Sequence, residues 1–170
     1  MLPELLFFYF AVAITGLSLL VVTRRNPVHS VLWMLLLFFH IAGLYVLLNA
    51  ELMAAVQVIV YAGAILVLFL FVVLLLDLRK EVEDEPYVDG WPVGIALAVG
   101  LFLAIGFMIH TFEPADPGAY SIEKVQSLTH SVAVGEKLYT EFLFPFEVVS
   151  MVLLVAVVGA IVLAKRKLKE

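Results

Sequence analysis

Hydrophobic residues fill five long stretches of the chain, and short polar segments separate them. The stretches cover residues 4–23, 28–48, 52–76, 92–112 and 142–164. A helix of about 20 apolar residues crosses the hydrocarbon core of a bilayer. The pattern therefore predicts an all-α membrane protein with five transmembrane helices. The third stretch is near the upper length limit, so we expect this helix to tilt or to contain an irregular turn.

Positive charges beside the five stretches give the expected direction of each helix. Loops rich in Lys and Arg stay on the cytoplasmic side of a membrane. One side of the predicted bundle carries two such residues, Lys124 and Lys137. The other side carries eight: Arg24, Arg25, Arg79, Lys80, Lys165, Arg166, Lys167 and Lys169. We therefore expect the N-terminus outside and the C-terminus in the cytoplasm.

The segment 113–141 is a sizeable connection on the outer side of the predicted bundle. Between Ser121 and Tyr139, apolar residues recur at the spacing of one helix face, at Ile122, Val125, Leu128, Val132 and Leu138. We expect a short surface helix here, packed on the bundle or on a neighbouring protein. Residues 1–170 as a whole are expected to form a single transmembrane domain.

Composition agrees with this class and limits the chemistry. The chain is 64% hydrophobic and 15% charged, whereas soluble domains average about 45–50% apolar and about 25% charged residues. It contains no cysteine, which excludes disulfides, thiolate zinc sites and ordinary iron–sulfur clusters held by this chain. The net charge of −5 lies almost entirely in the loops, and we expect a lipid bilayer and no nucleic acid as a partner.

Polar side chains within the predicted helices are costly in hydrocarbon, so each of them requires a reason. They are His40, Glu51, Gln57, Tyr61, His110 and Glu147. Two histidines at equal depth on facing helices could bind haem. At 1.5 Å per residue, however, His40 lies roughly 18 Å and His110 roughly 27 Å from the inner face, and His29 lies about one turn or less from it. These depths disfavour haem, and we expect His40 to form a hydrogen bond at a helix contact.

The third stretch carries the most informative polar pattern. Gln57, Tyr61 and Ala64 are spaced as i, i+3 and i+4 neighbours on a helix. Small residues that permit close approach of another helix accompany them, at Ala54, Ala55, Ala62, Gly63 and Ala64. Gln57 and Tyr61 could form interhelical hydrogen bonds or bind water in a proton path. Gly63 permits backbone distortion, and a π-bulge or kink is expected near residues 61–67.

Each of two glutamates could cap a helix N-terminus or act as a functional carboxylate. Glu51 lies at the outer turn of the third helix, where a negative charge caps the helix dipole favourably. Glu147 follows Pro145 in the first two turns of the fifth helix and has the same two interpretations. No lysine lies within any predicted span. A free-standing proton antiporter is expected to carry buried lysine–carboxylate charges, so this chain alone is a poor pump.

Two segments resemble one known family closely. They are residues 26–32 (NPVHSVL) and 54–73 (AAVQVIVYAGAILVLFLFVV), and residues 144–147 (FPFE) and 153–164 (LLVAVVGAIVLA) add to the similarity. The chain resembles the J subunit of bacterial NADH–quinone oxidoreductase, respiratory complex I, whose mitochondrial counterpart is NADH dehydrogenase subunit 6. The resemblance covers essentially the whole chain.

The resemblance implies a non-catalytic subunit in the membrane arm of a proton-translocating complex in the bacterial inner membrane. Family members bind no cofactor of their own, since FMN, iron–sulfur clusters and quinone belong to other subunits. They pack between the quinone-binding H subunit and the antiporter-like subunits such as N, against the small A and K subunits. A π-bulge at the family's YAGA segment maps onto Tyr61, Ala62, Gly63 and the following turn, and its straightening is linked to a water path for protons.

One position departs from some relatives, which have a glutamate where this chain has Gln57. Glutamine cannot carry a proton in that way, although it can still order water, so Glu51 becomes the better candidate carboxylate. The leading hypothesis is a conformational relay between quinone reduction and pumping. A purely structural scaffold in the same or a related complex, with ferredoxin or another donor, is the alternative. An independent small transporter is a third reading, weakened by the missing mid-membrane charges.

Overall fold

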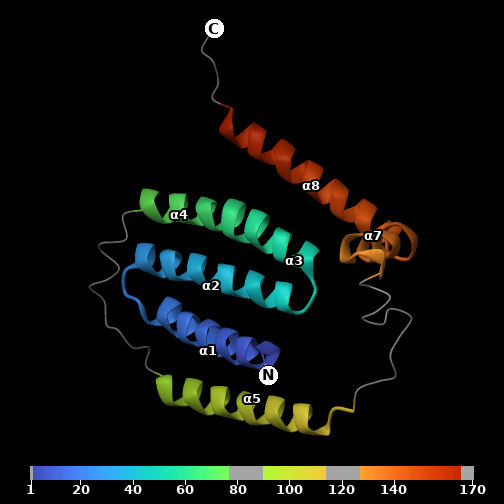
Figure 1. Cartoon of the computed structure of the whole chain (residues 1–170). Helices are drawn as coiled ribbons and strands as arrows, with labels where there is room; N and C mark the ends of the chain where they lie inside the picture. The colour runs from blue at the N-terminus through green and yellow to red at the C-terminus, as the bar shows by residue number, and fades with distance from the viewer. Residues whose placement is uncertain (1, 77–89, 114–126, 166–170) are drawn as a thin grey trace. The chain divides into compact units, whose positions relative to one another are not determined.

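The computed structural model describes residues 2–76, 90–113 and 127–165, and these residues form helices and connecting turns without a strand. The main helices in chain order are α1 (Leu2–Thr23), α2 (Pro27–Leu47), α3 (Glu51–Val56), a π-helix (Gln57–Ile65), α4 (Leu66–Leu75), α5 (Trp91–Thr111), α7 (His130–Thr140) and α8 (Leu143–Ala164) (Figure 1). The all-α prediction is therefore confirmed.

Five helices are long and apolar enough to cross a membrane: Leu2–Thr23, Pro27–Leu47, Glu51–Leu75, Trp91–Thr111 and Leu143–Ala164. The prediction of five spans is confirmed, and each predicted boundary lies within two residues of the observed one. The ends follow from local chemistry. Asn26 is the N-cap of α2, where its side-chain oxygen accepts a 3.0 Å hydrogen bond from the backbone N–H of Val28, and Pro27 occupies the first turn.

The first compact unit, Met1–Ser121, contains the first four spans. Within it, α1 packs on α2, and α2 packs on α3, the π-helix and α4 (Figure 1). Buried apolar side chains at these contacts include Leu17 of α1 and Val31 and Ala42 of α2. Gly43 permits one close approach, because a Cβ atom there would lie 2.7 Å from the ring of Phe10. The central helix α2 therefore joins the first and third spans.

The third span is one continuous helix whose hydrogen bonding changes twice. It begins as α3, continues as the nine-residue π-helix and ends as α4. Its buried residues are Ala54, Gln57, Ala62, Leu66 and Val73. The predicted irregular turn was placed near residues 61–67, and the observed π-helix begins four residues earlier, at Gln57.

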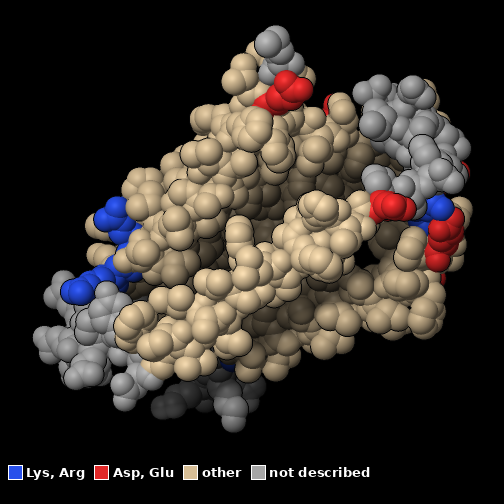
Figure 2. Space-filling model, turned by 90° about the horizontal axis from the view of Figure 1, so that it is seen from below, with Lys and Arg blue, Asp and Glu red and all other residues tan. Residues whose placement is uncertain are grey.

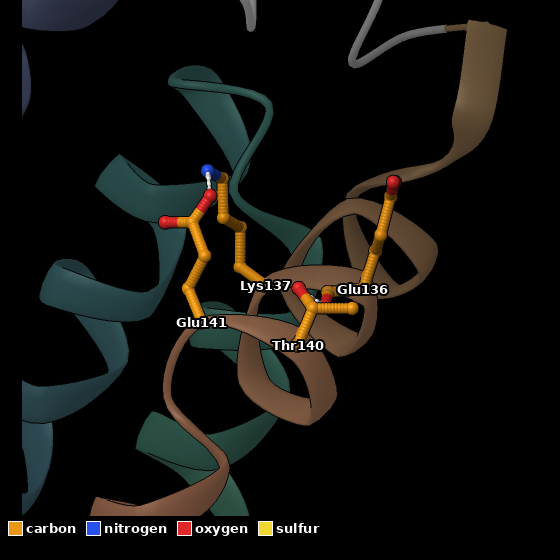
Figure 3. A network of polar contacts seen from close by, with 4 residues as sticks. All are labelled: Glu136, Lys137, Thr140 and Glu141. Carbon is orange, nitrogen blue, oxygen red and sulfur yellow. Dashed lines mark hydrogen bonds and ion pairs between the residues drawn. The ribbon is translucent and has the colours of Figure 1, made fainter.

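The second unit, Ile122–Glu170, contains α7 packed on α8. Figure 3 shows Lys137 and Glu141 paired at the end of α7, and the Thr140 hydroxyl donates a 2.6 Å hydrogen bond to the carbonyl oxygen of Glu136. The predicted surface helix between Ser121 and Tyr139 is not continuous. Its first part lies outside the described residues, and α7 begins at His130 because Thr129 has a φ of 67°, which no α-helix accommodates.

Most large apolar side chains of the described chain remain exposed, and neither α5 nor α8 has a buried residue. Most of the face seen in Figure 2 carries no charged group. A soluble protein rarely exposes apolar patches beyond a few hundred Å². Surfaces of this kind are suited to lipid and to the helices of other membrane proteins.

Candidate functional site in the third span

The π-helix defines the candidate site, because such segments interrupt α-helices mostly at functional positions. Its hydrogen bonds join each N–H to the carbonyl five residues earlier, as in the bond from the Leu66 N–H to the Tyr61 oxygen at its end. The sequence favours this geometry at Gly63. A Cβ atom at this position would lie 3.3 Å from the Val58 carbonyl oxygen, which is a tight contact with rigid backbone.

The π-helix also changes which residues face the rest of the bundle. Gln57 and Ala62 are both buried, at 6% and 3% exposure, although they lie five residues apart. In an α-helix, five residues correspond to one turn plus about 140°, so these two side chains would point in different directions. The five-residue step keeps both of them against the neighbouring helices. A return to α-helical hydrogen bonding would shift the register of one half of the span by about one residue. This shift corresponds to a rotation of about 100° relative to the other half.

Among the residues that the structure describes, Gln57 is the one polar residue that is buried. It lies at the junction of α3 and the π-helix, and both elements pack on α2. An amide inside a membrane is retained where it finds hydrogen-bond partners or water. A change of register at this position would therefore change the surroundings of a buried amide.

Tyr61 is partly exposed and contacts α2. Its side chain is 46% exposed, and its ring meets that of Phe38 on α2 edge-to-face, with centroids 6.2 Å apart. Ala64 is exposed as well. Of the three residues predicted to lie along one line of the helix, Gln57 is buried within this chain, whereas Tyr61 and Ala64 are exposed.

Glu51 is the first residue of α3 and is exposed. Ala50 occupies the N-cap position and offers no side-chain acceptor, so Glu51 is not the N-cap residue. Its charge nevertheless lies in the first turn, where the helix dipole favours a carboxylate. Glu147 is exposed in the second turn of α8, and the first turn of α8 contains no acidic residue. Because the dipole effect fades within one turn, capping does not account for Glu147.

His40 lies at a helix contact, as predicted. Its Nδ1 is 2.8 Å from the carbonyl oxygen of Leu36, which can only accept, so Nδ1 carries the proton. In the neutral ring, Nε2 then accepts the 3.2 Å hydrogen bond from the Tyr9 hydroxyl of α1. Sequence reasoning missed Tyr9. The available signal was its distance from the connecting turn, since Tyr9 and His40 lie about equally far from Arg25 on antiparallel helices.

Two other histidines of the first unit do not take part in this contact. His29 is an exposed residue in the first turn of α2, and His110 is exposed in the last turn of α5. Across residues 2–76, 90–113 and 127–165, no group of three His, Cys, Asp or Glu side chains could hold a metal ion. Of the small residues noted in the third span, Ala54 and Ala62 are buried, while Ala55, Gly63 and Ala64 remain exposed.

The five spans define a multi-pass integral membrane protein with an irregular third helix. Residues 17–163 match the family described as NADH-ubiquinone/plastoquinone oxidoreductase chain 6. The chain belongs to this family.

Individual relatives agree with the family match. NADH-quinone oxidoreductase subunit J of Rhodobacter capsulatus is 41% identical over 94% of this chain and 80% of the relative. NADH-ubiquinone oxidoreductase chain 6 of Marchantia polymorpha is 38% identical over 96% of this chain and 87% of its own length. NAD(P)H-quinone oxidoreductase chain 6 of Nostoc sp. is 38% identical over 92% of this chain and 76% of its own length.

Proposed function

We propose that this chain is a membrane-arm subunit of a proton-translocating NADH–quinone oxidoreductase and couples quinone reduction to proton translocation. The names of the relatives supply the enzyme complex. The observation that carries the coupling role is the π-helix Gln57–Ile65 in a span that is otherwise α-helical. We propose that this segment also adopts an α-helical form, which makes it a two-state element that events at a neighbouring site can bias.

In the proposed mechanism, reduction of quinone on another subunit changes the relative stability of the π-helical and α-helical forms. Conversion rotates one half of the span by about 100° relative to the other. This rotation moves Gln57 and Tyr61 relative to α2 and opens or closes a water path. Gln57 orders water and cannot itself carry the proton. Glu51 is the candidate carboxylate at the outer end, with Glu147 and His40 in secondary roles.

The proposal also assigns surroundings to the chain. It lies in the bacterial inner membrane with its N-terminus outside and its C-terminus in the cytoplasm. Its exposed apolar helices contact the H, A, K and antiporter-like N subunits. FMN, iron–sulfur clusters and quinone are bound by other subunits, and NADH is the electron donor. The exposed apolar side chains of α5 and α8, which contain no buried residue, support contacts of this kind.

The test replaces Gly63 by leucine in the assembled complex. A side chain at this position meets the Val58 carbonyl in the π-helical form, so Gly63→Leu disfavours that form. We expect coupled proton transfer to fall strongly while NADH oxidation by a peripheral acceptor is unchanged. Ala64→Leu is the matched control, because it adds similar bulk next to Gly63 at an exposed residue that already has a Cβ. Normal pumping in the Gly63→Leu complex would count against the relay.

A structural scaffold is the second candidate function, and the hydrogen bond between Tyr9 and His40 favours it as a device that only holds helices together. In a scaffold, Gln57→Leu and Tyr61→Phe alter the amount of assembled complex on native gels and nothing else. In a relay, the same variants assemble normally and translocate protons more slowly for each NADH oxidised. The ratio of pumping to assembled complex separates the two.

A further inference from the structure

An open groove runs along α2 at the end of the bundle where α1 and α2 are joined. Its volume is about 610 Å³, and its lining residues are Arg24, His29, Leu32, Trp33, Leu35, Leu36 and Phe39. Ligand sites commonly have volumes of about 300–1,000 Å³. The groove is polar at its mouth, where Arg24 and His29 lie, and apolar along the rest of its length. This division is typical of a site for an amphipathic ligand.

The arginine at the mouth is held in place by the turn between the helices. Its guanidinium carbon lies 5.9 Å from the centroid of the Trp33 ring, which is within the range of a cation–π contact. Its carbonyl oxygen accepts a 3.4 Å hydrogen bond from the Ser30 hydroxyl. The Asn26 cap fixes the same turn. Arg24 remains exposed, so its guanidinium is free to bind an anion at the membrane surface.

The length of the groove matches one leaflet of a bilayer. From His29 to Phe39 the helix rises about 15 Å, and half of the hydrocarbon core is also about 15 Å thick. Leu32, Leu36 and Phe39 are exposed along this distance, at 53%, 42% and 49%. Trp33 lies about one turn from the mouth, near the depth where tryptophan is enriched in membrane proteins.

We propose that this groove binds an anionic phospholipid of the leaflet at this end of the bundle. The Arg24 guanidinium pairs with the phosphate, Trp33 contacts the glycerol region, and one acyl chain lies along Leu32, Leu36 and Phe39. A guanidinium matches the planar, two-oxygen geometry of a phosphate better than a point charge does. The site is independent of the proposed relay, since its residues belong to α2 and the turn before it.

Fluorescence of Trp33 tests the proposal directly. The chain has two tryptophans, so Trp91→Phe leaves Trp33 as the single reporter in the full chain embedded in nanodiscs. The probes are phosphatidylglycerol and phosphatidylcholine, each with brominated acyl chains that quench tryptophan on contact. We expect phosphatidylglycerol to quench at about fivefold lower mole fraction, the preference that one surface arginine supplies. Equal quenching by the two lipids would overturn the proposal.

Charge variants connect the preference to Arg24. Arg24→Gln abolishes the difference between the lipids, and Arg24→Lys restores part of it. Arg25→Gln is the matched control, because Arg25 is the adjacent exposed arginine and does not line the groove; it retains most of the preference. A preference that survives in Arg24→Gln contradicts the assignment.

A second measurement uses the intact complex, in which another subunit could cover the groove. A photoreactive benzoylphenylalanine replaces Leu36, which is exposed on the groove wall. After illumination, mass spectrometry identifies what is attached to this chain. An adduct with phospholipid supports the proposal, whereas an adduct with another subunit shows that protein occupies the groove and refutes it.

Discussion

Replacing Gly63 by alanine should shift the third span from the π-helical to the α-helical form. Two effects act in the same direction. Alanine stabilises an α-helix by about 1 kcal/mol relative to glycine. In the π-helical form, the added Cβ atom lies 3.3 Å from the Val58 carbonyl oxygen, so this form gains less or is destabilised. A difference of about 1 kcal/mol changes the ratio of the two forms about fivefold.

The contact between Phe38 and Tyr61 reports this equilibrium. Their rings lie 6.2 Å apart in the π-helical form, and a rotation of about 100° about the helix axis separates them. Because the chain contains no cysteine, Phe38→Cys and Tyr61→Cys introduce a unique pair for a short thiol-reactive cross-linker. We expect the initial rate of cross-linking to fall with the population of the π-helical form when Gly63→Ala is added, by at most about fivefold.

A control pair distinguishes rotation from general loosening. Phe10→Cys with Gly43→Cys joins α1 and α2, away from the π-helix, and should react equally with and without Gly63→Ala. An unchanged rate for the pair at 38 and 61 would refute the reasoning, because the alanine would then leave the helix in its original register. Loss of both cross-links would indicate unfolding and would also contradict it.

The contact between α1 and α2 gives two further predictions. Tyr9→Phe removes the hydrogen bond to His40 and should lower the free energy of unfolding in mixed micelles by about 0.6 kcal/mol and at most about 1.7 kcal/mol. The loss in the double variant with His40→Ala should be smaller than the sum of the two single losses; full additivity would exclude the bond. Gly43→Val forces the Phe10 ring to move and should lower the free energy of unfolding by about 1–3 kcal/mol in the same assay. Gly16→Val should lower it much less, because the space around the Gly16 Cβ position is open. Equal losses in the two variants would contradict the described packing of Gly43 on Phe10.

The number and bounds of the spans could be predicted because bilayer thickness fixes the length of an apolar helix. The polar turns at Asn26 and Asn49 then decide where each helix begins or ends. Asn49 has a φ of 59°, a left-handed conformation that asparagine adopts more readily than most residues. These signals are local, and the sequence displays them directly.

The register of the third span could not be predicted in the same way. Helical periodicity assumes 3.6 residues per turn, and this assumption grouped Gln57 with Tyr61. In the π-helix, Gln57 and Ala62 are both buried although they lie five residues apart, which a period of 3.6 residues does not anticipate. Gly63 and the length of the span indicated an irregular turn, but its starting residue depends on the competition between two hydrogen-bonding patterns, which composition does not encode.

Contacts between residues far apart in the sequence were the second feature that could not be predicted. His40 was expected at a helix contact, but its partner Tyr9 depends on how α1 rotates about its own axis. Thr129 gave no sequence signal for its φ of 67°, since threonine rarely adopts this conformation, and the predicted surface helix was extended through it. The pairing of Tyr9 with His40 depends on a tertiary contact, which local preference does not display.

The proton translocation rate of the assembled Gly63→Ala complex tests the relay most directly. The rate would be measured in proteoliposomes at saturating NADH and quinone, beside NADH oxidation by a peripheral acceptor. If a π-helical third span is required, translocation falls in proportion to the population of that form, by at most about fivefold, and peripheral oxidation is unchanged. A complex with the slower Phe38–Tyr61 cross-link and a normal translocation rate would contradict the account.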